Sequence, residues 1–496
     1  MTALHVQNLS VEIGGTSLVD GVSFDVARGE CLAIVGESGA GKSLTAAALL
    51  GLAPPAAHVT ADEMSVDGAD TRRLTDGGWR ELRGSRIGLV SQDALSSLDP
   101  LRRIGAEIAE PLAIHTRLSR PARRARAVEL LESVSMPDAE RRSGQYPHEL
   151  SGGLRQRALI ASALAGEPAV LIADEPTTAL DATVQVRVLA LLRSIVDAGT
   201  AVVFISHDFA AVRRVADRVL VMRDGRVIEH GPVSDVLGAP QEEYTRELIA
   251  ASEHRPREER PGLGTAVLTG VGVSKAFAGA PAVVEASFAV RQGRTLGVVG
   301  ESGSGKTTLA RMIVGVERPD TGDVRWTGEH RVQLVHQNPR GAFDARWTIE
   351  RSLREALEAG GVPRAARAAL VADLMAEVDL APELAKRRPA QLSGGQRQRA
   401  AIARALAADP DVLVLDEPVS ALDPSVREKV LQLLRRLQRE RGLTMVFVSH
   451  DLGVVAAVCD DVLVMQDGVI VEQGAVTEVF ADPQHPFTQE LLAASA

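Results

Sequence analysis

The sequence is poor in aromatic residues, which make up 3% of its 496 positions. A core with so few aromatic side chains has to be filled by alanine, valine, leucine and isoleucine. The chain has only two cysteines, Cys31 and Cys459, which cannot form a disulfide framework or a metal cluster by themselves. We expect both to be small buried side chains.

Lysine is also scarce, because five of the 55 basic residues are lysines and the other 50 are arginines. The positions of the lysines are therefore informative. The net charge of −10 lacks the basic excess of nucleic-acid-binding domains, so we expect no nucleic-acid partner. No secretory signal pattern opens the chain, and its most apolar stretch, residues 44–57, is too short for a bilayer. We expect a soluble protein, or one that reaches a membrane only through partners.

What the chain does contain is one set of motifs twice, in the same order. The pairs are GESGAGKS (36–43) and GESGSGKT (300–307), LSGGLRQR (150–157) and LSGGQRQR (392–399), ADEPTTALD (173–181) and LDEPVSALD (415–423), and FISHD (204–208) and FVSHD (447–451). A period of about 260 residues indicates a tandem domain duplication. The two halves differ mainly in one spacing. Lys42 is followed by Gln92 after 50 residues, whereas Lys306 is followed by Gln337 after 31.

The halves are joined by a segment that mixes charges of both signs with two prolines. This composition is typical of an exposed linker. We expect a first domain over residues 1–250, a linker over 251–264 and a second domain over 265–496. Within each half, apolar runs such as residues 31–35, 170–174 and 201–206 alternate with helical patterns. This alternation predicts an α/β fold with a mostly parallel sheet.

Each Gly-rich motif follows an apolar run and precedes a helical pattern, which is the context of a phosphate-binding loop. Glycines let backbone N–H groups surround phosphates at a helix N-terminus. Two of the five lysines lie here, where a compact ammonium suits the β- and γ-phosphates better than a planar guanidinium. One such loop alone leaves kinases and GTPases open. The predicted nucleotide-binding residues are Gly36, Glu37, Ser38, Gly39, Ala40, Gly41, Lys42 and Ser43, with Gly300, Glu301, Ser302, Gly303, Ser304, Gly305, Lys306 and Thr307.

An acidic pair and a histidine follow apolar runs in each half. Phosphoryl transfer needs positioning and charge neutralisation more than covalent chemistry. A hydroxyl and a carboxylate would hold Mg²⁺, a cation that favours oxygen ligands. The predicted metal ligands are Ser43, Asp174, Thr307 and Asp416. Glu175 and Glu417 would orient or deprotonate the attacking water, and His207 and His450 would contact the γ-phosphate.

Together with the LSGG segments, these motifs resemble the ATP-binding-cassette (ABC) ATPases along nearly the whole chain. The resemblance implies ATP and Mg²⁺ as cofactors, and cassettes with a parallel sheet core, an antiparallel β subdomain and a helical subdomain. It also implies that the two cassettes pair within the chain and that the LSGG of one binds the γ-phosphate held by the other. The residues implied by the family are Gln92 and Gln337 as catalytic residues and metal ligands, and Ser151, Gly152, Gly153, Ser393, Gly394 and Gly395 as nucleotide-binding residues.

Two departures from the family pattern stand out. Phe277 matches an aromatic residue that stacks on adenine, but its equivalent in the first half is Ile13. The first site is therefore expected to hold ATP more weakly. Leu154 replaces the glutamine found as Gln396 in the second LSGG motif.

Four features are similar to the branch of peptide and nickel importers. Both phosphate loops read GESG-x-GK, SQDALSSLDP (91–100) matches that branch's glutamine loop, and the ends of the two halves (239–251 and 482–494) are similar to its tail. The resemblance implies a peripheral ATPase subunit on the cytoplasmic face of the membrane, two separate transmembrane permease subunits contacted through residues 92–101 and 337–347, and an extracytoplasmic substrate-binding protein. The cargo would be peptides or related small solutes.

Two alternatives differ in class or cargo. Fused sugar-importer ATPases have a similar length, but their second phosphate loop is usually degenerate, whereas residues 300–307 are intact here. Ribosome-associated translation factors with two cassettes carry a long basic linker, whereas the linker here is short and mixed in charge.

Overall fold

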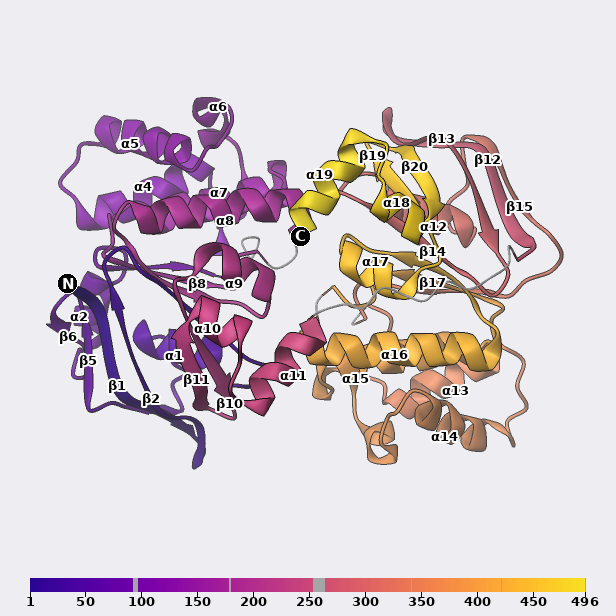
Figure 1. Cartoon of the computed structure of the whole chain (residues 1–496), viewed down its shortest axis with the longest axis horizontal. Helices are drawn as coiled ribbons and strands as arrows, with labels where there is room; N and C mark the ends of the chain where they lie inside the picture. The colour runs from indigo at the N-terminus through magenta and orange to yellow at the C-terminus, as the bar shows by residue number, and fades with distance from the viewer. Residues whose placement is uncertain (92–96, 178–179, 253–263, 340, 421, 496) are drawn as a thin grey trace. The chain divides into compact units, whose positions relative to one another are not determined.

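The computed structural model describes residues 1–91, 97–177, 180–252, 264–339, 341–420 and 422–495. The chain divides into two compact units: unit 1 is Met1–Leu180 with Val184–Ser252, and unit 2 is Asp181–Thr183 with Glu253–Ala496. Each unit is α/β and combines a six-stranded sheet with a smaller antiparallel sheet and a group of helices, so the predicted class is confirmed (Figure 1). Gln92 and most of the predicted linker lie outside the described residues.

The main sheet of unit 1 has the strand order β11-β10-β3-β9-β8-β7, and only the β10–β11 pair is antiparallel. Its strands are β3 (Cys31–Val35), β7 (Ile87–Val90), β8 (Val170–Asp174), β9 (Ala201–Ile205), β10 (Arg218–Arg223) and β11 (Arg226–Pro232). Every residue of β3 and β9 is buried, as expected for parallel strands that are covered on both faces. The carboxyl ends of these strands carry the motifs of the first half.

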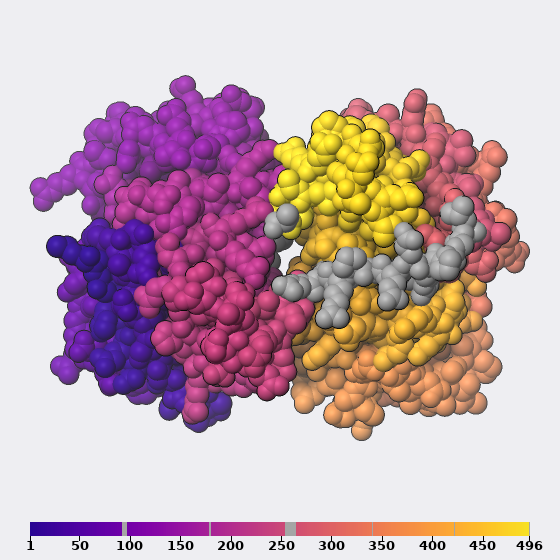
Figure 2. Space-filling model, in the orientation of Figure 1, coloured from indigo at the N-terminus to yellow at the C-terminus, as the bar shows by residue number. Residues whose placement is uncertain are grey.

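The antiparallel sheet of unit 1 is built around a long hairpin. Its strands are β1 (Thr2–Ile13), β2 (Thr16–Ala27), β4 (Ala57–Thr60), β5 (Glu63–Val66) and β6 (Ala69–Asp70). Gly14 and Gly15, both at positive φ, form the two-residue turn between β1 and β2. Figure 2 shows the indigo N-terminal strands packed directly against the magenta segment that carries β10 and β11.

Four of the helices of unit 1 form a separate group. The helices are α1 (Lys42–Leu49), α2 (Asp76–Leu82), α4 (Ile104–His115), α5 (Arg120–Ser133), α6 (Ala139–Ser143), α7 (Gly152–Leu164), α8 (Ala182–Asp197), α9 (Phe209–Val215), α10 (Val233–Gly238) and α11 (Glu243–Ser252). Helices α4 to α7 lie together, on the opposite side of the unit from β1 and β2 (Figure 1). This group is the helical subdomain that the family resemblance implies.

Unit 2 repeats this architecture. Its main sheet has the order β16-β17-β18-β14-β19-β20, and its smaller sheet β13-β12-β15. The strands are β12 (Ala266–Phe277), β13 (Ala280–Arg291), β14 (Thr295–Gly300), β15 (Thr321–Trp326), β16 (Val332–Val335), β17 (Val412–Asp416), β18 (Thr444–Val448), β19 (Asp461–Gln466) and β20 (Val469–Ala475). The helices are α12 (Lys306–Ile313), α13 (Ile349–Ala359), α14 (Arg367–Glu377), α15 (Gly394–Leu406), α16 (Pro424–Arg441), α17 (Leu452–Val458), α18 (Val476–Ala481) and α19 (Pro486–Ser495).

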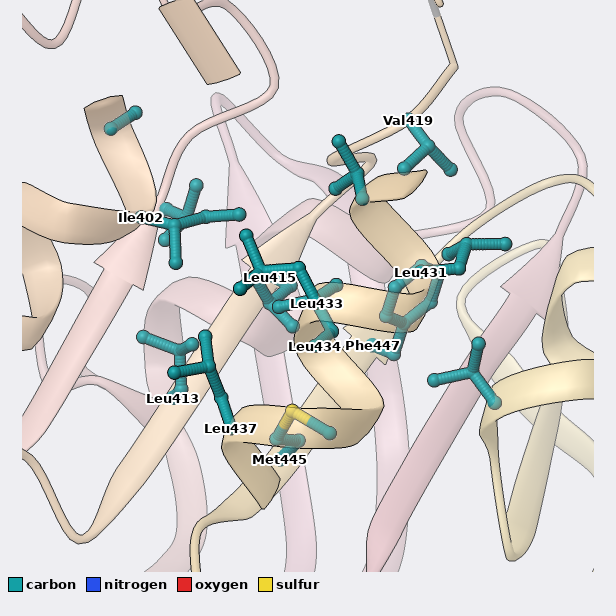
Figure 3. Close-up of a cluster of buried hydrophobic side chains, with 14 of the residues drawn as sticks. Ile402, Leu413, Leu415, Val419, Leu431, Leu433, Leu434, Leu437, Met445 and Phe447 are labelled. Atoms are coloured by element: carbon teal, nitrogen blue, oxygen red, sulfur yellow. The ribbon is translucent and has the colours of Figure 1, made fainter. Parts of the chain in front are cut away.

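The core of unit 2 is aliphatic, as the scarcity of aromatic residues predicts. Leucines of α16 pack on side chains of β17 and β18, and Phe447 lies among them (Figure 3). Phe447 and its counterpart Phe204 are the largest side chains that are fully buried. Cys31 and Cys459 are both buried and not joined in a disulfide, which confirms the expectation for both. Burial raises the pKa of the Cys31 thiol far above its ordinary range.

The two units differ between the phosphate loop and the edge strand of the main sheet. In unit 1 the helix α1 is followed by β4, β5, β6 and α2 before β7, whereas in unit 2 only β15 lies between α12 and β16. Trp79 on α2 is buried and packs against Gly51, where an added Cβ would lie 2.4 Å from the indole. The additional elements account for the longer spacing to Gln92.

No helix among the described residues is long and apolar enough to cross a membrane.

Candidate functional site

The phosphate-binding loops connect β3 to α1 and β14 to α12, and each begins with a glycine that no other residue can replace. Gly36 has a φ of 152° and Gly300 a φ of 151°. A Cβ at Gly36 would lie 2.3 Å from the carbonyl oxygen of Met222, and one at Gly300 would lie 2.1 Å from that of Met465. A side chain at either position would therefore displace the loop from the neighbouring strand.

The lysine of each loop is held by the loop's own backbone. The Nζ of Lys42 donates to the carbonyl oxygens of Gly36 (2.7 Å) and Glu37 (2.8 Å). The Nζ of Lys306 donates to those of Gly300 (2.8 Å) and Glu301 (2.6 Å). Both lysines are only 6% exposed, and burial lowers the pKa of Lys306. Each helix N-terminus thus carries a positioned ammonium beside backbone donors, which is an arrangement that binds phosphate.

A hydroxyl and a carboxylate meet next to each loop. The Oγ of Ser43 lies 3.4 Å from Oδ1 of Asp174, and Oγ1 of Thr307 lies 3.3 Å from Oδ1 of Asp416. Burial raises the pKa of both aspartates, and the hydrogen bond from the hydroxyl opposes that shift. A bound dication would favour their ionised form.

The donor set of each site fits Mg²⁺. Among the described residues, no group of three or more His, Cys, Asp or Glu side chains is arranged to hold a metal. Each site instead offers one hydroxyl and one carboxylate, both hard oxygen ligands. Mg²⁺ is commonly held by one or two carboxylates together with substrate phosphates and water.

The glutamate that follows each aspartate is paired with the predicted histidine. The Nδ1 of His207 lies 3.1 Å from Oε1 of Glu175, and the Nδ1 of His450 lies 3.3 Å from Oε1 of Glu417. Both glutamates have left-handed backbones, with φ of 47° and 46°. Their N–H groups donate to the carbonyl oxygens of Ile205 and Val448 at the ends of the adjacent strands. Such a conformation in a non-glycine residue costs of order 1 kcal/mol, and here it recurs at the same position of the two units.

The glutamine of the second half also reaches this pair. The Nε2 of Gln337 donates to Oε2 of Glu417 at 2.8 Å. Because the amide nitrogen is engaged by Glu417, the amide oxygen of Gln337 is the atom that can ligate a metal. The predicted role of Gln92 concerns a residue outside the described part of the chain.

The pair of His450 and Glu417 makes stability depend on pH. Burial alone would lower the pKa of His450, but the hydrogen bond and charge of Glu417 outweigh it and raise the pKa above 6.5. Burial alone would raise the pKa of Glu417, but His450 lowers it below 4.5. The histidine's contribution is complete below pH 6.5 and is lost as the pH rises through its folded-state pKa. The glutamate's contribution is present above pH 4.5 and is lost as the pH falls through its folded-state pKa.

We expect His450→Asn to destabilise the protein most between about pH 4.5 and 6.5, and progressively less above that range. Chemical denaturation of the variant and the unchanged chain at a series of pH values measures this difference. His58→Asn, at an exposed position, is the control and should show no such pH dependence. A His450→Asn effect that is constant across the pH range would contradict the pairing.

The two LSGG segments begin helices, but they are capped differently. Ser393 and Gln396 form a reciprocal capping box, because Oγ of Ser393 accepts from the N–H of Gln396 (3.3 Å) and Oε1 of Gln396 accepts from the N–H of Ser393 (3.0 Å). Ser151 makes no side-chain cap, and the side chain of Leu154 has no oxygen that could accept from the N–H of Ser151. The departure noted in the sequence thus removes the reciprocal half of the capping box.

The last glycine of each LSGG segment has a packing reason to be glycine. A Cβ at Gly153 would lie 2.3 Å from Cγ1 of Val184, and one at Gly395 would lie 2.1 Å from Cγ1 of Val426. Both valines belong to the helix that follows the acidic pair. The nucleotide-binding role predicted for these glycines stays a prediction.

The candidate adenine contact occupies matching positions in the two hairpins. Ile13 is the last residue of β1 and pairs with Thr16, and Phe277 is the last residue of β12 and pairs with Ala280. Phe277 is 44% exposed, so its ring is accessible to a ligand. The Nζ of Lys275 lies 5.7 Å from the centre of that ring.

Sequence reasoning missed the contact that Tyr244 makes with the phosphate loop of unit 1. The hydroxyl of Tyr244 on α11 accepts a hydrogen bond from the N–H of Glu37 at 3.3 Å. The Arg223 guanidinium stacks over the tyrosine ring at 4.7 Å, and the tyrosine is 8% exposed. The corresponding residue of unit 2 is Phe487, which has no hydroxyl. The tail motif of the first half pointed to this position but not to its contact.

The structure therefore gathers most of the predicted site residues around each phosphate loop. Unit 1 brings together Lys42, Ser43, Asp174, Glu175 and His207, and unit 2 brings together Lys306, Thr307, Asp416, Glu417, His450 and Gln337. Within the described residues no hydrogen bond joins Ser151 or Ser393 to the phosphate loop of its own unit.

Comparisons with known proteins agree with this geometry. The family model described as ABC transporter matches residues 19–178 and 283–420. The chain is 42% identical to the peptidoglycan transport ATP-binding protein YejF of Agrobacterium fabrum, over 99% of this chain and 96% of that protein. It is 39% identical to the glutathione import ATP-binding protein GsiA of Escherichia coli O6:H1, over 99% of this chain and 89% of that protein.

Two solved structures share the fold. One is the archaeal ribosome recycling factor aABCE1 in complex with the ribosomal stalk protein aP1, with a TM-score of 0.63 and 21% identity over 91% of this chain and 86% of that one. The other is RNase-L Inhibitor, with a TM-score of 0.64 and 21% identity over 95% of this chain and 91% of that one. At this identity the likeness concerns the fold alone.

The matched segments cover more than half of the chain, and one lies in each unit. The predicted family and the predicted ATPase activity are both confirmed by the family match and by the ATP-binding relatives. Two phosphate loops, two acidic pairs and two histidines in matching places make this chain an ATPase that belongs to the ABC transporter family.

Proposed function

We propose that the chain is the ATP-hydrolysing subunit of an importer that takes up peptides or related small solutes. The observation that carries this proposal is the match over nearly the whole chain to two proteins named for transport of peptidoglycan and import of glutathione. Both of these compounds contain peptide. The tail segments and the first glutamine loop, similar to those of peptide importers, support the same cargo class.

Hydrolysis would depend on residues that the two units position alike. Backbone donors and Lys42 or Lys306 hold the phosphates, and Glu175 or Glu417 orients the attacking water. The histidine hydrogen-bonded to each glutamate fixes the direction of its carboxylate. Mg²⁺, when held by Ser43 and Asp174 or by Thr307 and Asp416, would neutralise charge on the phosphates.

We further propose that each ATP site is completed by the LSGG serine of the other cassette, as the family resemblance implies. Ser151 and Ser393 stand at helix N-termini, where a hydroxyl and backbone N–H groups favour an anion. ATP would then favour association of the cassettes and hydrolysis would release them. Carrying both cassettes on one chain raises their effective concentration for each other.

The partners in this proposal are two transmembrane permease subunits and an extracytoplasmic substrate-binding protein, with the chain on the cytoplasmic face of the membrane. Residues 92–101 and 337–347 are the proposed permease contacts. Leu101 in the first of these segments is 85% exposed, which supports a contact with another protein. Residues 92–96 lie outside the described part of the chain.

The two alternatives are less well supported. A fused sugar-importer ATPase would usually have a degenerate second phosphate loop, whereas Lys306, Thr307 and Asp416 keep the same contacts as their counterparts in unit 1. A ribosome-associated factor shares the fold at 21% identity, whereas the relatives at about twice that identity are named for transport.

Uptake by cells that lack the chain tests the proposal. We expect such cells to lose uptake of at least one labelled solute among dipeptides, tripeptides, glutathione and peptidoglycan peptides. The unchanged chain should restore uptake, and a chain with Glu175→Gln and Glu417→Gln should not. Uptake of all these solutes at the normal rate, combined with ATP-dependent sedimentation of the chain with ribosomes, would overturn the proposal in favour of the translation factor.

We expect Phe277→Ala to weaken ATP binding at the second site at least about fivefold, because stacking of a base on an aromatic ring contributes about 1–3 kcal/mol. Ile13→Phe should strengthen binding at the first site by a similar factor. Titration with a fluorescent ATP analogue, in chains whose other phosphate-loop lysine is replaced by alanine, separates the two sites. If Phe277→Ala left the affinity unchanged, the ring would not contact adenine.

A further inference from the structure

Unit 2 has a groove of about 480 Å³ whose lining includes none of the predicted ATP-site residues. Four of the side chains that line it are cationic and one, Asp379, is a carboxylate. We call it the basic groove, and its cations are Arg399 on α15 and Lys429, Arg436 and Arg439 on α16. A local charge of about +3 is unusual on a chain whose net charge is −10.

The sequence of α16 produces this groove through helical spacing. Lys429, Gln432, Leu433 and Arg436 are three, four and seven residues apart and therefore share one face of the helix. Leu433 is only 1% exposed and belongs to the hydrophobic core of the unit (Figure 3). The groove therefore has an apolar floor with cations and an amide around it.

Two of the cations are fixed by the end of α14. An Nη atom of Arg399 donates to the carbonyl oxygen of Asp379 at 2.7 Å. One Nη of Arg436 donates to the carbonyl oxygen of Glu377 at 2.6 Å and lies 3.1 Å from a carboxylate oxygen of Asp379. Since a guanidinium has five N–H donors, these contacts hold each arginine in place and leave further donors for a ligand.

The other two cations have no such partner. Lys429 and Arg439 are exposed, and neither forms an ion pair with any of the residues that the structure describes. The four cations around one groove repel one another, and the single carboxylate of Asp379 offsets only part of that repulsion. The groove is thus complementary in charge to an anionic ligand.

Unit 1 lacks this concentration of charge. The positions that match Arg399, Lys429, Arg436 and Arg439 are Arg157, Arg187, Ser194 and Asp197. Asp197 forms an ion pair with Arg193 at 2.7 Å. The basic groove is therefore a property of the second half, and the shared fold does not require it.

We propose that the basic groove binds a compact polyanion with two or more phosphate groups. Its volume is in the range of sites for small molecules. Arginine forks match phosphate oxygens in a bidentate geometry, and the lysine ammonium adds a point charge. The α16 cations span ten residues, about 15 Å of helix, so a ligand with more than one phosphate group can contact several of them at once. Leu433 and Gln432 could contact the rest of the ligand.

The scarcity of lysine allows a direct test, because mass spectrometry can follow acetylation of each of the five lysines separately. Pyrophosphate should slow the acetylation of Lys429 at least threefold. Lys386 is also exposed in the same unit but lies outside the groove, so its acetylation rate should not change. Equal effects of pyrophosphate on Lys429 and Lys386 would overturn the proposal.

Charge reversal shows whether the protection comes from the groove. Arg439→Glu alters an exposed groove residue and should abolish the protection of Lys429. Arg124→Glu makes the same charge change at an exposed position of unit 1 and should leave the protection intact. Protection of Lys429 that persists in Arg439→Glu would overturn the proposal, because it would come from elsewhere on the chain.

The source of the phosphates is distinguished by a second probe. Phosphatidylcholine vesicles with and without phosphatidic acid are compared with free pyrophosphate. Protection by pyrophosphate that the vesicles do not exceed assigns the groove to a soluble ligand, and stronger protection by vesicles containing phosphatidic acid than by pyrophosphate assigns it to the phosphates of a lipid surface. Protection by polyglutamate alone would overturn the phosphate proposal in favour of an acidic peptide.

Discussion

Replacing either of the glutamates proposed to orient the attacking water with glutamine is expected to slow ATP turnover about a hundredfold or more, since a positioned acid–base group contributes about 10²–10⁴-fold. Glu175 and Glu417 each lie beside a histidine, next to the aspartate predicted to hold the metal, and in the same left-handed conformation. Glutamine keeps the size and an acceptor oxygen for the histidine, but it loses the negative charge. We therefore expect turnover to fall while ATP binding stays close to normal.

Steady-state phosphate release and equilibrium binding of ATP measure the two quantities separately. Glu132→Gln, at an exposed position, removes one carboxylate charge in unit 1 and should leave both unchanged. If turnover by Glu417→Gln stayed near normal, the second site would not be needed for hydrolysis. A fall in ATP binding as large as the fall in turnover would show that the glutamate acts by holding the loop.

The parts of the fold that the sequence predicted best are short, fully buried strands. Residues 31–35 and 170–174 were expected as strands and form β3 and β8 with the same bounds. Such segments are apolar throughout because both faces are covered, and their limits are set by the polar loops that follow. The first helix begins at Lys42, inside the Gly-rich motif, because Gly41 serves as its N-cap.

The phosphate-loop motifs also predicted contacts across long sequence distances. Ser43 meets Asp174 across 131 residues because parallel strands place their carboxyl ends at one edge of the sheet. What could not be predicted depends on tertiary packing. The left-handed backbone of Glu175 is imposed by its bond to Ile205, and the contact of Tyr244 with Glu37 depends on where α11 docks.

The differences between the two halves could be predicted only in part from the sequence. The change from Gln396 to Leu154 was visible, but its effect on the serine cap required the helix geometry. The basic groove was not visible at all, because its cations come from separate segments that only folding brings together. Local motifs thus predicted what the two units share, and side-chain packing determines where they differ.

Replacing the loop lysines with arginine is expected to weaken ATP binding about tenfold or more, almost as strongly as replacement with alanine. Arginine outnumbers lysine ten to one in this chain, yet both phosphate loops carry lysine. Lys42 and Lys306 are buried, and each ammonium fits between two carbonyl oxygens of its own loop at 2.6 to 2.8 Å. A planar guanidinium is larger and cannot occupy that space without opening the loop.

Equilibrium titration of ATP with Lys42→Arg and Lys306→Arg, each compared with the alanine variant, measures this loss. Lys386→Arg is the matched control, because this lysine is exposed and contacts neither loop, and its ATP affinity should equal that of the unchanged chain. Charge alone would make arginine a good substitute, whereas shape makes it a poor one. Near-normal binding by both arginine variants would therefore show that the positive charge, and not the compact ammonium enclosed by the loop, is what the phosphates require.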